Sequence, residues 1–549
     1  MHRWKLSIIS KIILLTVTAT FAQEPQFDWA LQAGGAQDDV GMSTQCDHNG
    51  NTYLTGRFQD SASFGDTVLV TDFLHKMFLV KYDNYGTLQW ARQATGQGIS
   101  IGTALAVDNE NNCLLAGFFG GELILEDTSF TSQTFDAPFL AKFSPAGDLL
   151  WAIHFQTMYG NIYDLAVGSG GTIYVTGRFD STLMIEDSLR ISQGGSDLFV
   201  AKFSPQGELL NLRTIGTSGI DWGNAIVPDS AGNLYLYGKV ENFYHFMNGN
   251  VDTTLKGGFI TKFSPQGEMT WLVGIQNYAA HLGIKSMELS PEQGIVIGGN
   301  FANFVTIHDT TLTTGDDIDI FIAKLSGDGQ VLWVDRNGGI YNDEVQNLSV
   351  DKNGIITLCG SSNYLNLYYY GYALRYDNDG NFLWSRLFGG PYNTSGSGVS
   401  NDADNNIYLT GTFNLMGVFG DTLLTSAGRA DVFLLKLTPG VPLTIEEPLP
   451  IRSDLFALLS NYPNPFNPST TIPYLLNLTA EVELSIYNIL GQKVITLVKK
   501  EQPPGQYQIT WEGVDQNGNA VASGVYLYQL KVKTPSKQEI KSKKMMLLR

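Results

Sequence analysis

One residue pattern recurs along most of this 549-residue chain. Each copy joins a strand-like segment ending in Lys, a turn containing Gly, and a segment that usually carries Trp. The clearest copies are FLAKFSPAGDLLWA, FVAKFSPQGELLNL and FITKFSPQGEMTWL. The turn glycines are Gly86, Gly147, Gly207, Gly267, Gly329, Gly380 and Gly440, at intervals of 61, 60, 60, 62, 51 and 60 residues. Seven copies of one unit are therefore predicted, and each must bury its apolar surface against its neighbours.

Within each unit the pattern is that of β-strands. Residues 104–107 and 112–117 are short apolar runs on either side of a turn. Such turns read DHNG, DNEN, DSAG, DKNG and DADN, and these residue types tolerate the positive φ of tight hairpins. No convincing amphipathic helix occurs in residues 23–440. Radial stacking of four-stranded sheets buries both faces of each sheet, which predicts an all-β chain built as a β-propeller.

The two ends of the repeat array carry complementary parts of one unit. The array begins with FDWALQAGG, a Trp-containing strand without the three strands that should precede it. The seventh unit stops at FLLKLTPG and lacks such a strand. We therefore predict a seven-bladed β-propeller over residues 23–440, in which residues 27–33 complete the last blade.

These repeats resemble the bacterial SBBP β-propeller repeats. The segments that carry the resemblance are DNNIYLTGTF and DVFLLKLTPG, and the pattern covers about 415 residues. Single copies depart from it, since Asn211 stands where Trp is expected and Arg375 where Lys is expected. These departures weaken individual blades and leave the repeat count unchanged.

The first 22 residues have the features of a secretory signal peptide. Basic residues precede the apolar stretch at 12–17, and small residues follow at positions suited to cleavage after Ala22. The alternative, an uncleaved membrane anchor, is disfavoured because Lys11 interrupts the apolar run. No later segment is long and apolar enough to span a membrane, so no transmembrane segment is expected.

The net charge of −19 is unevenly distributed. Residues 23–440 contain 44 acidic and 20 basic residues, whereas residues 441–549 contain 9 acidic and 11 basic residues. An acidic surface repels phosphates, so nucleic acid and anionic lipid are poor partners. Cys46, Cys113 and Cys359 are too far apart in sequence to form a compact metal motif, and we expect them to be small buried residues.

A second domain follows the repeats. Residues 441–458 are rich in Pro and suit a linker, and residues 459–549 contain alternating segments such as EVELSIYN and SGVYLYQLKV. Val482, Leu484 and Ile486 fall on one face of such a strand, as in a small immunoglobulin-like β-sandwich.

This second domain also resembles the type A sorting domain of cargo proteins of the type IX secretion system. The matching segments are YPNPFNPSTTI, IYNILGQKV, SGVY and the basic tail KSKKMMLLR. A more distant resemblance is to an immunoglobulin-like domain of flagellar hook-capping proteins. The resemblance implies that residues 459–549 engage the type IX secretion machinery. It further implies that the chain passes through the periplasm and is either released or attached to the outer cell surface.

Catalytic signatures are absent from the sequence. It contains no HExxH motif, nucleophile elbow, phosphate-binding Gly-Lys loop or repeated Asp-box, so we predict no enzyme, catalytic residues or cofactor. Residues 377–381 (DNDGN) and 402–406 (DADNN) begin like calcium loops, but neither is followed by a bidentate Glu. Their place in hairpins explains them without a metal, and no metal site is predicted.

The repeated Lys and Trp residues are predicted to be structural. A stem of Lys covers apolar surface beside a turn while its charge meets water or a nearby acid. The tryptophans lie in strand-like segments and are expected to pack between blades.

Aromatic residues in the loops that differ among units are candidates for ligand binding. Propeller loops gather on one face, and aromatic rings with polar neighbours suit glycans or peptides. The candidate residues are Tyr159, Tyr163, Trp222, Tyr278, His281, Tyr341 and Tyr392. The sequence thus favours a secreted or cell-surface binding protein. A structural envelope component and an extracellular polysaccharide hydrolase or lyase are the alternatives.

Overall fold

The computed structural model describes residues 25–72, 74–248, 251–277, 283–292, 294–338, 342–364, 368–390, 392–438, 456–458, 461, 464–476, 479–503, 505–534 and 538–548. The predicted signal peptide, residues 1–22, lies outside these residues, as do residues 441–455 of the predicted linker. The regular secondary structure of the described part is β-strand, apart from one turn of 3₁₀ helix at Ser169–Gly171. The predicted all-β fold is therefore confirmed.

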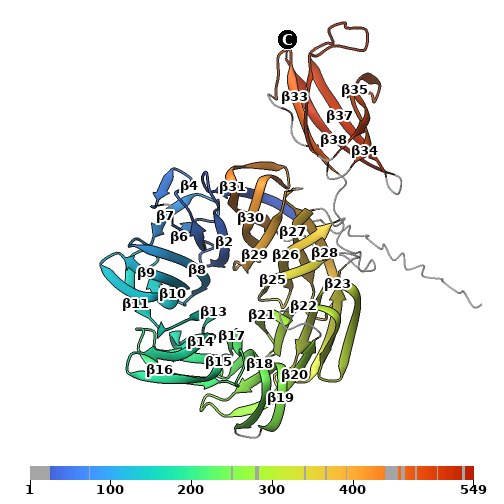
Figure 1. Cartoon of the computed structure of the whole chain (residues 1–549). Coiled ribbons are helices and arrows are strands. Elements are labelled where there is room, and N and C mark those ends of the chain that lie inside the picture. The colour runs from blue at the N-terminus through green and yellow to red at the C-terminus, as the bar shows by residue number, and fades with distance from the viewer. Residues whose placement is uncertain are drawn as a thin grey trace, which may run out of the picture.

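Successive antiparallel sheets form a ring. In each repeat, one strand lies innermost, close to the centre of the ring (Figure 1). The first sheet contains β2 (Val40–Cys46), β3 (Thr52–Phe58), β6 (Lys76–Tyr82) and β7 (Leu88–Gln93), with the hairpin β4 (Ser61–Phe64) and β5 (Thr67–Val70) beside it. The second contains β8 (Gly98–Val107), β9 (Cys113–Leu125), β10 (Thr128–Phe143) and β11 (Leu149–His154). The third contains β12 (Gln156–Thr157), β13 (Gly160–Val167), β14 (Ile173–Ile185), β15 (Ser188–Phe203) and β16 (Leu209–Ile215).

The next sheet contains the strands of two repeats. Its strands are β17 (Trp222–Pro228), β18 (Leu234–Asn248), β19 (Val251–Phe263), β20 (Met269–Asn277), β21 (Gly283–Ser290), β22 (Gly294–Ile307), β23 (Thr310–Leu325) and β24 (Val331–Asn337). The two halves join where Ile275, Gln276 and Asn277 pair with Ile307, Thr306 and Val305. Because these repeats share one continuous sheet, the blade number of seven stays a prediction.

The ring closes with a strand from the beginning of the chain. A four-stranded sheet of β25 (Asp343–Val350), β26 (Ile356–Tyr364), β27 (Tyr368–Tyr376) and β28 (Phe382–Phe388) precedes the closing sheet. The closing sheet contains β29 (Thr394–Asn401), β30 (Ile407–Phe419), β31 (Thr422–Thr438) and β1 (Gln26–Ala33). Strand β1 pairs antiparallel with β31, with Leu31 opposite Leu434. Figure 1 shows the blue β1 beside the orange β31.

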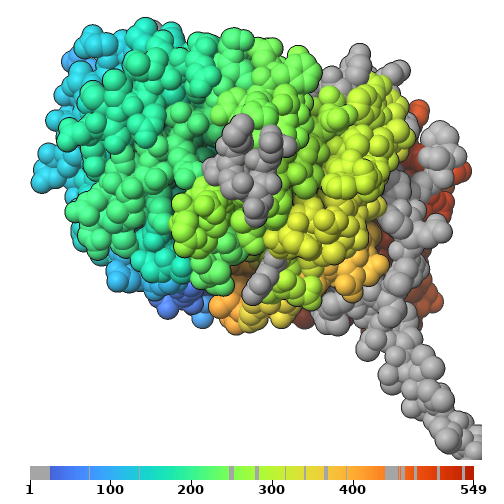
Figure 2. Space-filling view, turned by 90° about the horizontal axis from the view of Figure 1, so that it is seen from below, coloured from blue at the N-terminus to red at the C-terminus, as the bar shows by residue number. Residues whose placement is uncertain are grey.

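Hydrophobic clusters fill the spaces between neighbouring sheets. One cluster joins Tyr53 and Leu79 of the first sheet to Leu115 and Phe139 of the second, and all four side chains are buried. The units follow one another in chain order along the rim, from cyan through green to yellow (Figure 2). Burial between units supplies the main driving force, because apolar area contributes about 25 cal/mol per Å² removed from water.

The same polar contact joins neighbouring units at five boundaries. The indole Nε1 of a Trp and the Nζ of a Lys from one unit both donate to one turn carbonyl of the neighbouring unit, at 3.0–3.4 Å. The pairs and their carbonyls are Trp29 and Lys436 with Asn84, Trp90 and Lys81 with Pro145, Trp151 and Lys142 with Pro205, Trp271 and Lys262 with Gly327, and Trp333 and Lys324 with Asn378. This confirms, for these five tryptophans, the prediction that they pack between units.

The turn glycine beneath each Trp has no room for a side chain. A Cβ on Gly147, whose φ is +89°, would lie 2.8 Å from the Trp90 ring. We expect Gly147→Ala to lower the free energy of unfolding by roughly 2–3 kcal/mol, from left-handed strain and from the ring contact. Gly232→Ala is the control: its φ is +82°, but its nearest neighbour is 3.7 Å away. Equal losses in urea denaturation of both variants would contradict the packing explanation.

The second domain is a sandwich of two sheets around its own core. One sheet contains β32 (Phe456–Leu458), β33 (Thr470–Leu476) and β36 (Gly505–Trp511), and the other contains β34 (Ala480–Asn488), β35 (Lys493–Gln502), β37 (Gly524–Lys533) and β38 (Gln538–Leu547). Val482, Leu484 and Ile486 are buried, as predicted. The linker boundary needs correction. Phe456 and Leu458 are buried in this core, so the sandwich includes strand β32 and does not begin at residue 459.

Candidate functional site

A β-bulge interrupts the innermost strand of each repeat. The pairing of β2, β8, β13, β17, β21, β25 and β29 with the following strand skips one residue in each case. The skipped residues are Met42, Thr103, Tyr163, Asn224, Lys285, Gln346 and Ser397. A bulge turns its extra side chain away from the regular alternation of the strand.

The skipped residues all line one cavity, and we call them the bulge ring. The innermost strands contact one another in cyclic order, from β2 through β8, β13, β17, β21 and β25 to β29, which contacts β2 again. They enclose a cavity of about 200 Å³ to which every bulge residue contributes. The repeated scaffold thus brings together one residue per repeat, although these residues are far apart in the sequence.

The bulges depend on a glycine in the second strand of each repeat. A Cβ on Gly56 would lie 1.9 Å from the carbonyl oxygen of Val40, and one on Gly177 would lie 1.8 Å from that of Asn161. Any other residue would push the two strands apart beside the bulge. The glycine in segments such as TYLTGRF and IYVTGRF therefore permits the close approach at the bulge.

The bulge ring is chemically varied. It contains a thioether, two hydroxyls, a phenol, two amides and one ammonium group, that of Lys285. Asp164 and Glu288 line the same cavity. Burial raises the pKa of Asp164 to about 7. Burial and then the charge of Asp164 raise the pKa of Glu288 to about 8. The cavity therefore offers several hydrogen-bond donors and acceptors in an environment that disfavours carboxylate charge.

Asp164 links two neighbouring strands. Its carboxylate accepts from the backbone N–H of Ile226 at 2.7 Å and from that of Leu165 at 2.8 Å. Asn347 holds the equivalent position in β25, one residue after its bulge, and its Oδ1 accepts from the N–H of Val399 at 3.2 Å. An amide thus makes the same inter-strand bond without carrying a charge.

We expect Asp164→Asn to flatten the pH dependence of stability. An unfolded Asp titrates near 3.9, whereas Asp164 in the fold titrates at about 7. Its contribution to stability is complete below the unfolded pKa and is lost as pH rises through the folded pKa. The variant should therefore gain on the order of 1–3 kcal/mol at pH 8 relative to wild type.

Urea denaturation at pH 5 and pH 8 measures this effect. Asn347→Asp is the matched reverse exchange and should steepen the loss of stability between the same two pH values. Parallel pH profiles for wild type and both variants would show that these positions do not bury a carboxylate.

Of the predicted ligand-binding residues that the structure describes, only Tyr163 lies in the central cavity. Tyr163 lines it from the bulge of β13. Tyr159 lies before β13 and is exposed. Trp222 packs its ring under the ammonium of Lys239, 5.5 Å away, and Tyr392 lies half-buried before β29. The remaining candidates, Tyr278, His281 and Tyr341, lie outside the described residues. Tyr159 and Trp222 do not line this cavity, and their role in ligand binding stays a prediction.

The other bulge residues were missed because they are neither aromatic nor in loops. A signal for them is nevertheless present, since the bulge residues recur at intervals of 61, 60, 61, 61, 61 and 51 residues. Four of them fall one position after a glycine, at Gly41, Gly102, Gly223 and Gly396, so an alignment of the repeats with one another would have marked them.

The turns considered as calcium loops are ordinary hydrogen-bonded turns. Asp377 Oδ1 accepts from the N–H groups of Asp379 and Asn381, and Asp402 Oδ1 accepts from those of Asp404 and Asn406. Among the described residues, no cluster of His, Cys, Asp and Glu is arranged to hold a metal ion. Within the same residues, no helix is long and apolar enough to cross a membrane.

Two family descriptions match parts of this chain. The "FlgD Ig-like domain" matches residues 468–537, within the sandwich. The SBBP "Beta-propeller repeat" matches residues 383–412, from β28 into β30. Both agree with the folds of the regions they cover.

Several known proteins are similar over longer stretches. An uncharacterized WD repeat-containing protein, L264 of Acanthamoeba polyphaga mimivirus, is 22% identical over 478 residues, covering 70% of this chain and 31% of that protein. The regulatory protein FlaEY of Caulobacter vibrioides is 26% identical over 318 residues, covering 52% of this chain and 32% of that protein. The chain therefore spans about a third of the length of these curated relatives.

Solved structures also resemble this chain, and one of them does so over most of its length. PorZ of Porphyromonas gingivalis, described as an essential bacterial surface component of the type-IX secretion system, is 12% identical, with a TM-score of 0.24. The similarity covers 95% of this chain and 100% of that chain. A likeness at this TM-score says nothing about what this chain binds.

Proposed function

We propose that this chain is an exported recognition protein whose bulge ring binds part of a glycan or peptide. The observation that carries this proposal is that equivalent bulges present a different side chain in every repeat. A purely structural role would favour the same residue in each copy, as the Trp and Lys contacts between units do. Variable residues on a constant scaffold are typical of binding sites.

The chemistry of the cavity suits uncharged polar groups. Asn224 and Gln346 each offer an amide donor and acceptor, and Tyr163 adds an aromatic ring with a hydroxyl. Sugar hydroxyls and peptide amides require such partners. The volume of about 200 Å³ is below the roughly 300–1,000 Å³ of sites for drug-sized ligands. We therefore expect it to take one sugar unit or one side chain of a larger molecule.

Binding can be tested with the purified full chain on glycan and peptide arrays. The proposal expects a restricted set of related ligands, with binding lost in Gln346→Ala. Gln346 is a partly buried residue of the ring, and truncation leaves its strand pairing intact. The absence of binding to any glycan or peptide would contradict the proposal and favour a structural envelope component.

We further propose that the C-terminal sandwich is a sorting domain for type IX secretion, which implies a secreted or cell-surface protein. The Pro-rich segment that resembles this family is folded into the domain, because Phe466 is 2% exposed and packs 5.6 Å from the Trp511 ring. Deleting residues 456–549 should retain the protein in the periplasm. A matched control is Tyr159→Ala, which should still be secreted. Secretion of the deletion variant would contradict this role.

A hydrolase or lyase is the second candidate, and the specific observation in its favour is the carboxylate pair Asp164 and Glu288. A raised pKa is typical of a general acid. Both oxygens of Asp164, however, already accept backbone N–H groups, that of Leu165 in the same strand and that of Ile226 in β17. We therefore favour binding without catalysis. Turnover of a polysaccharide by wild type but not by Glu288→Gln would overturn this choice.

A further inference from the structure

One contact between units lacks its tryptophan. Asn211 in β16 stands where the other units place Trp90 or Trp151, and Pro265 carries the carbonyl that such an indole would meet. No donor to the Pro265 carbonyl is found among the described residues. The shared turn geometry is nevertheless kept, since the N–H of Gly267 bonds to the carbonyl of Ser264 at 2.8 Å. The interface therefore retains a turn built to receive an indole.

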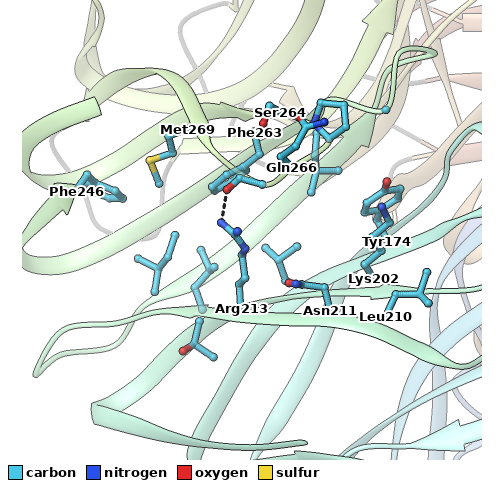
Figure 3. A pocket seen from close by; sticks show the side chains of 18 of the residues that line it. Tyr174, Lys202, Leu210, Asn211, Arg213, Phe246, Phe263, Ser264, Gln266 and Met269 are labelled. Carbon is cyan, nitrogen blue, oxygen red and sulfur yellow. Dashed lines mark hydrogen bonds between the residues drawn. The ribbon is translucent and has the colours of Figure 1, made fainter. Parts of the chain in front are cut away.

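A cavity of about 610 Å³ lies at this contact, between β16 and the turn that follows β19. Its walls include the rings of Tyr174, Phe246 and Phe263 (Figure 3) and that of Tyr244. No residue of the bulge ring lines it. Its volume lies within the roughly 300–1,000 Å³ of small-molecule sites.

Lys202, which lines this cavity, has lost the acid that pairs with its equivalents. Lys142 pairs with Asp108 at 2.8 Å and Lys81 with Asp47 at 3.1 Å. In the third unit the corresponding turn is Gly168 to Thr172 and contains no acid. Among the described residues, no carboxylate pairs with Lys202, whose only recorded partner is the Tyr174 ring 5.5 Å away.

Arg213 is a second cation in the same cavity. Its equivalent in the first unit, Arg92, lies over Trp90 and within 4.0 Å of Glu126. Arg213 has neither partner: its guanidinium donates to the carbonyl of Gly267 and lies 5.6 Å from the Phe263 ring (Figure 3). Glu186 in the third unit instead accepts from the N–H of Leu209 at 3.0 Å. The described part of the cavity thus holds two cations and no paired acid.

We propose that this cavity binds a small planar aromatic carboxylate. The ring takes the place of the missing indole between the aromatic walls, and a ring N–H donates to the carbonyl of Pro265. The carboxylate pairs with Lys202 and Arg213. Each part of such a ligand matches one feature of the site. The apolar ring fills the space between the aromatic walls, the N–H meets the Pro265 carbonyl, and the anionic group pairs with the two cations.

Indole-3-acetate has all three features and is a suitable probe for isothermal titration with the full chain. Wild type is expected to bind it, and neutral indole is expected to bind at least roughly tenfold more weakly because the charged contact is lost. Lys202→Met should weaken indole-3-acetate binding by a similar factor. Equal affinities for indole and indole-3-acetate would overturn the role of the cations.

Asn211→Trp supplies the missing indole within the chain. It is expected to abolish indole-3-acetate binding and to raise the midpoint of thermal unfolding, because it restores the contact found at the other interfaces. Arg92→Met, at an interface that has its Trp, is the control and should leave binding unchanged. Unaltered binding by a folded Asn211→Trp variant would overturn the proposed site. If that variant fails to fold, the Lys202→Met comparison decides on its own.

Discussion

Deleting residues 26–33 is expected to cost more than about 5 kcal/mol of the free energy of unfolding. This is comparable with the whole stability of a typical domain, about 5–15 kcal/mol. Strand β1 pairs with β31 from Gln26 to Ala33, and its Trp29 fastens the closing sheet to the turn at Asn84. Its loss exposes the edge of β31 and opens the cluster that contains Val432 and Leu434. Thermal unfolding followed by circular dichroism should show a lost or strongly shifted transition.

Deleting the second domain provides the control for this experiment. The sandwich has a hydrophobic core of its own, built from residues such as Ile472, Leu484 and Trp511. Removing residues 456–549 should therefore leave the transition of the repeat array in place. A β1 deletion that unfolds at the same temperature as the full array would show that closure by β1 contributes little.

The second large effect is expected from Lys142→Met, at about 3–5 kcal/mol of destabilisation. Lys142 and Asp108 form an ion pair at 2.8 Å, and their side chains are only 7% and 6% exposed. Burial opposes ionisation of Asp108, but the bonds from Lys142 and Asn112 outweigh it and lower its pKa. Without Lys142 this carboxylate stays buried without a countercharge. Urea denaturation at neutral pH measures the loss.

Two further variants identify the cause. Lys202→Met at the equivalent position should cost much less, because no acid is left unpaired in the third unit. The double variant Asp108→Asn with Lys142→Met should recover part of the stability lost by Lys142→Met alone. A Lys142→Met variant that is no less stable than Lys202→Met would contradict this explanation.

Much of the fold could be predicted because the repeats carry local signals. The repeated Trp, Lys and turn Gly mark the strands and their order. The segment FDWALQAGG, which contains Trp29, has the sequence of a fourth strand but lacks the three strands that precede it in other units. The structure pairs that segment, Gln26–Ala33, with β31. The junction between β20 and β22 could not be predicted. It depends on how far the β22–β23 hairpin reaches across the rim, which no single residue indicates.

The candidate site was predicted less well. Tyr163 was chosen as a loop aromatic, yet it lies in a strand and reaches the cavity only because a bulge turns it there. Bulges arise from close backbone approach at Gly56 and its equivalents, a tertiary effect that alternation along one strand does not show. Tyr159 and Trp222 were chosen as aromatic residues of the loops that differ among units, and neither lines this cavity.

We propose that the bulge ring, and not the aromatic loops, recognises the ligand. The most direct test is to titrate one ligand identified on the arrays into two variants of the full chain. Tyr163→Phe with Gln346→Ala alters the bulge ring, and Tyr159→Ala with Tyr392→Ala alters the loops. We expect the first variant to lose binding and the second to keep it. Loss of binding in the loop variant, with normal binding in the bulge variant, would contradict it.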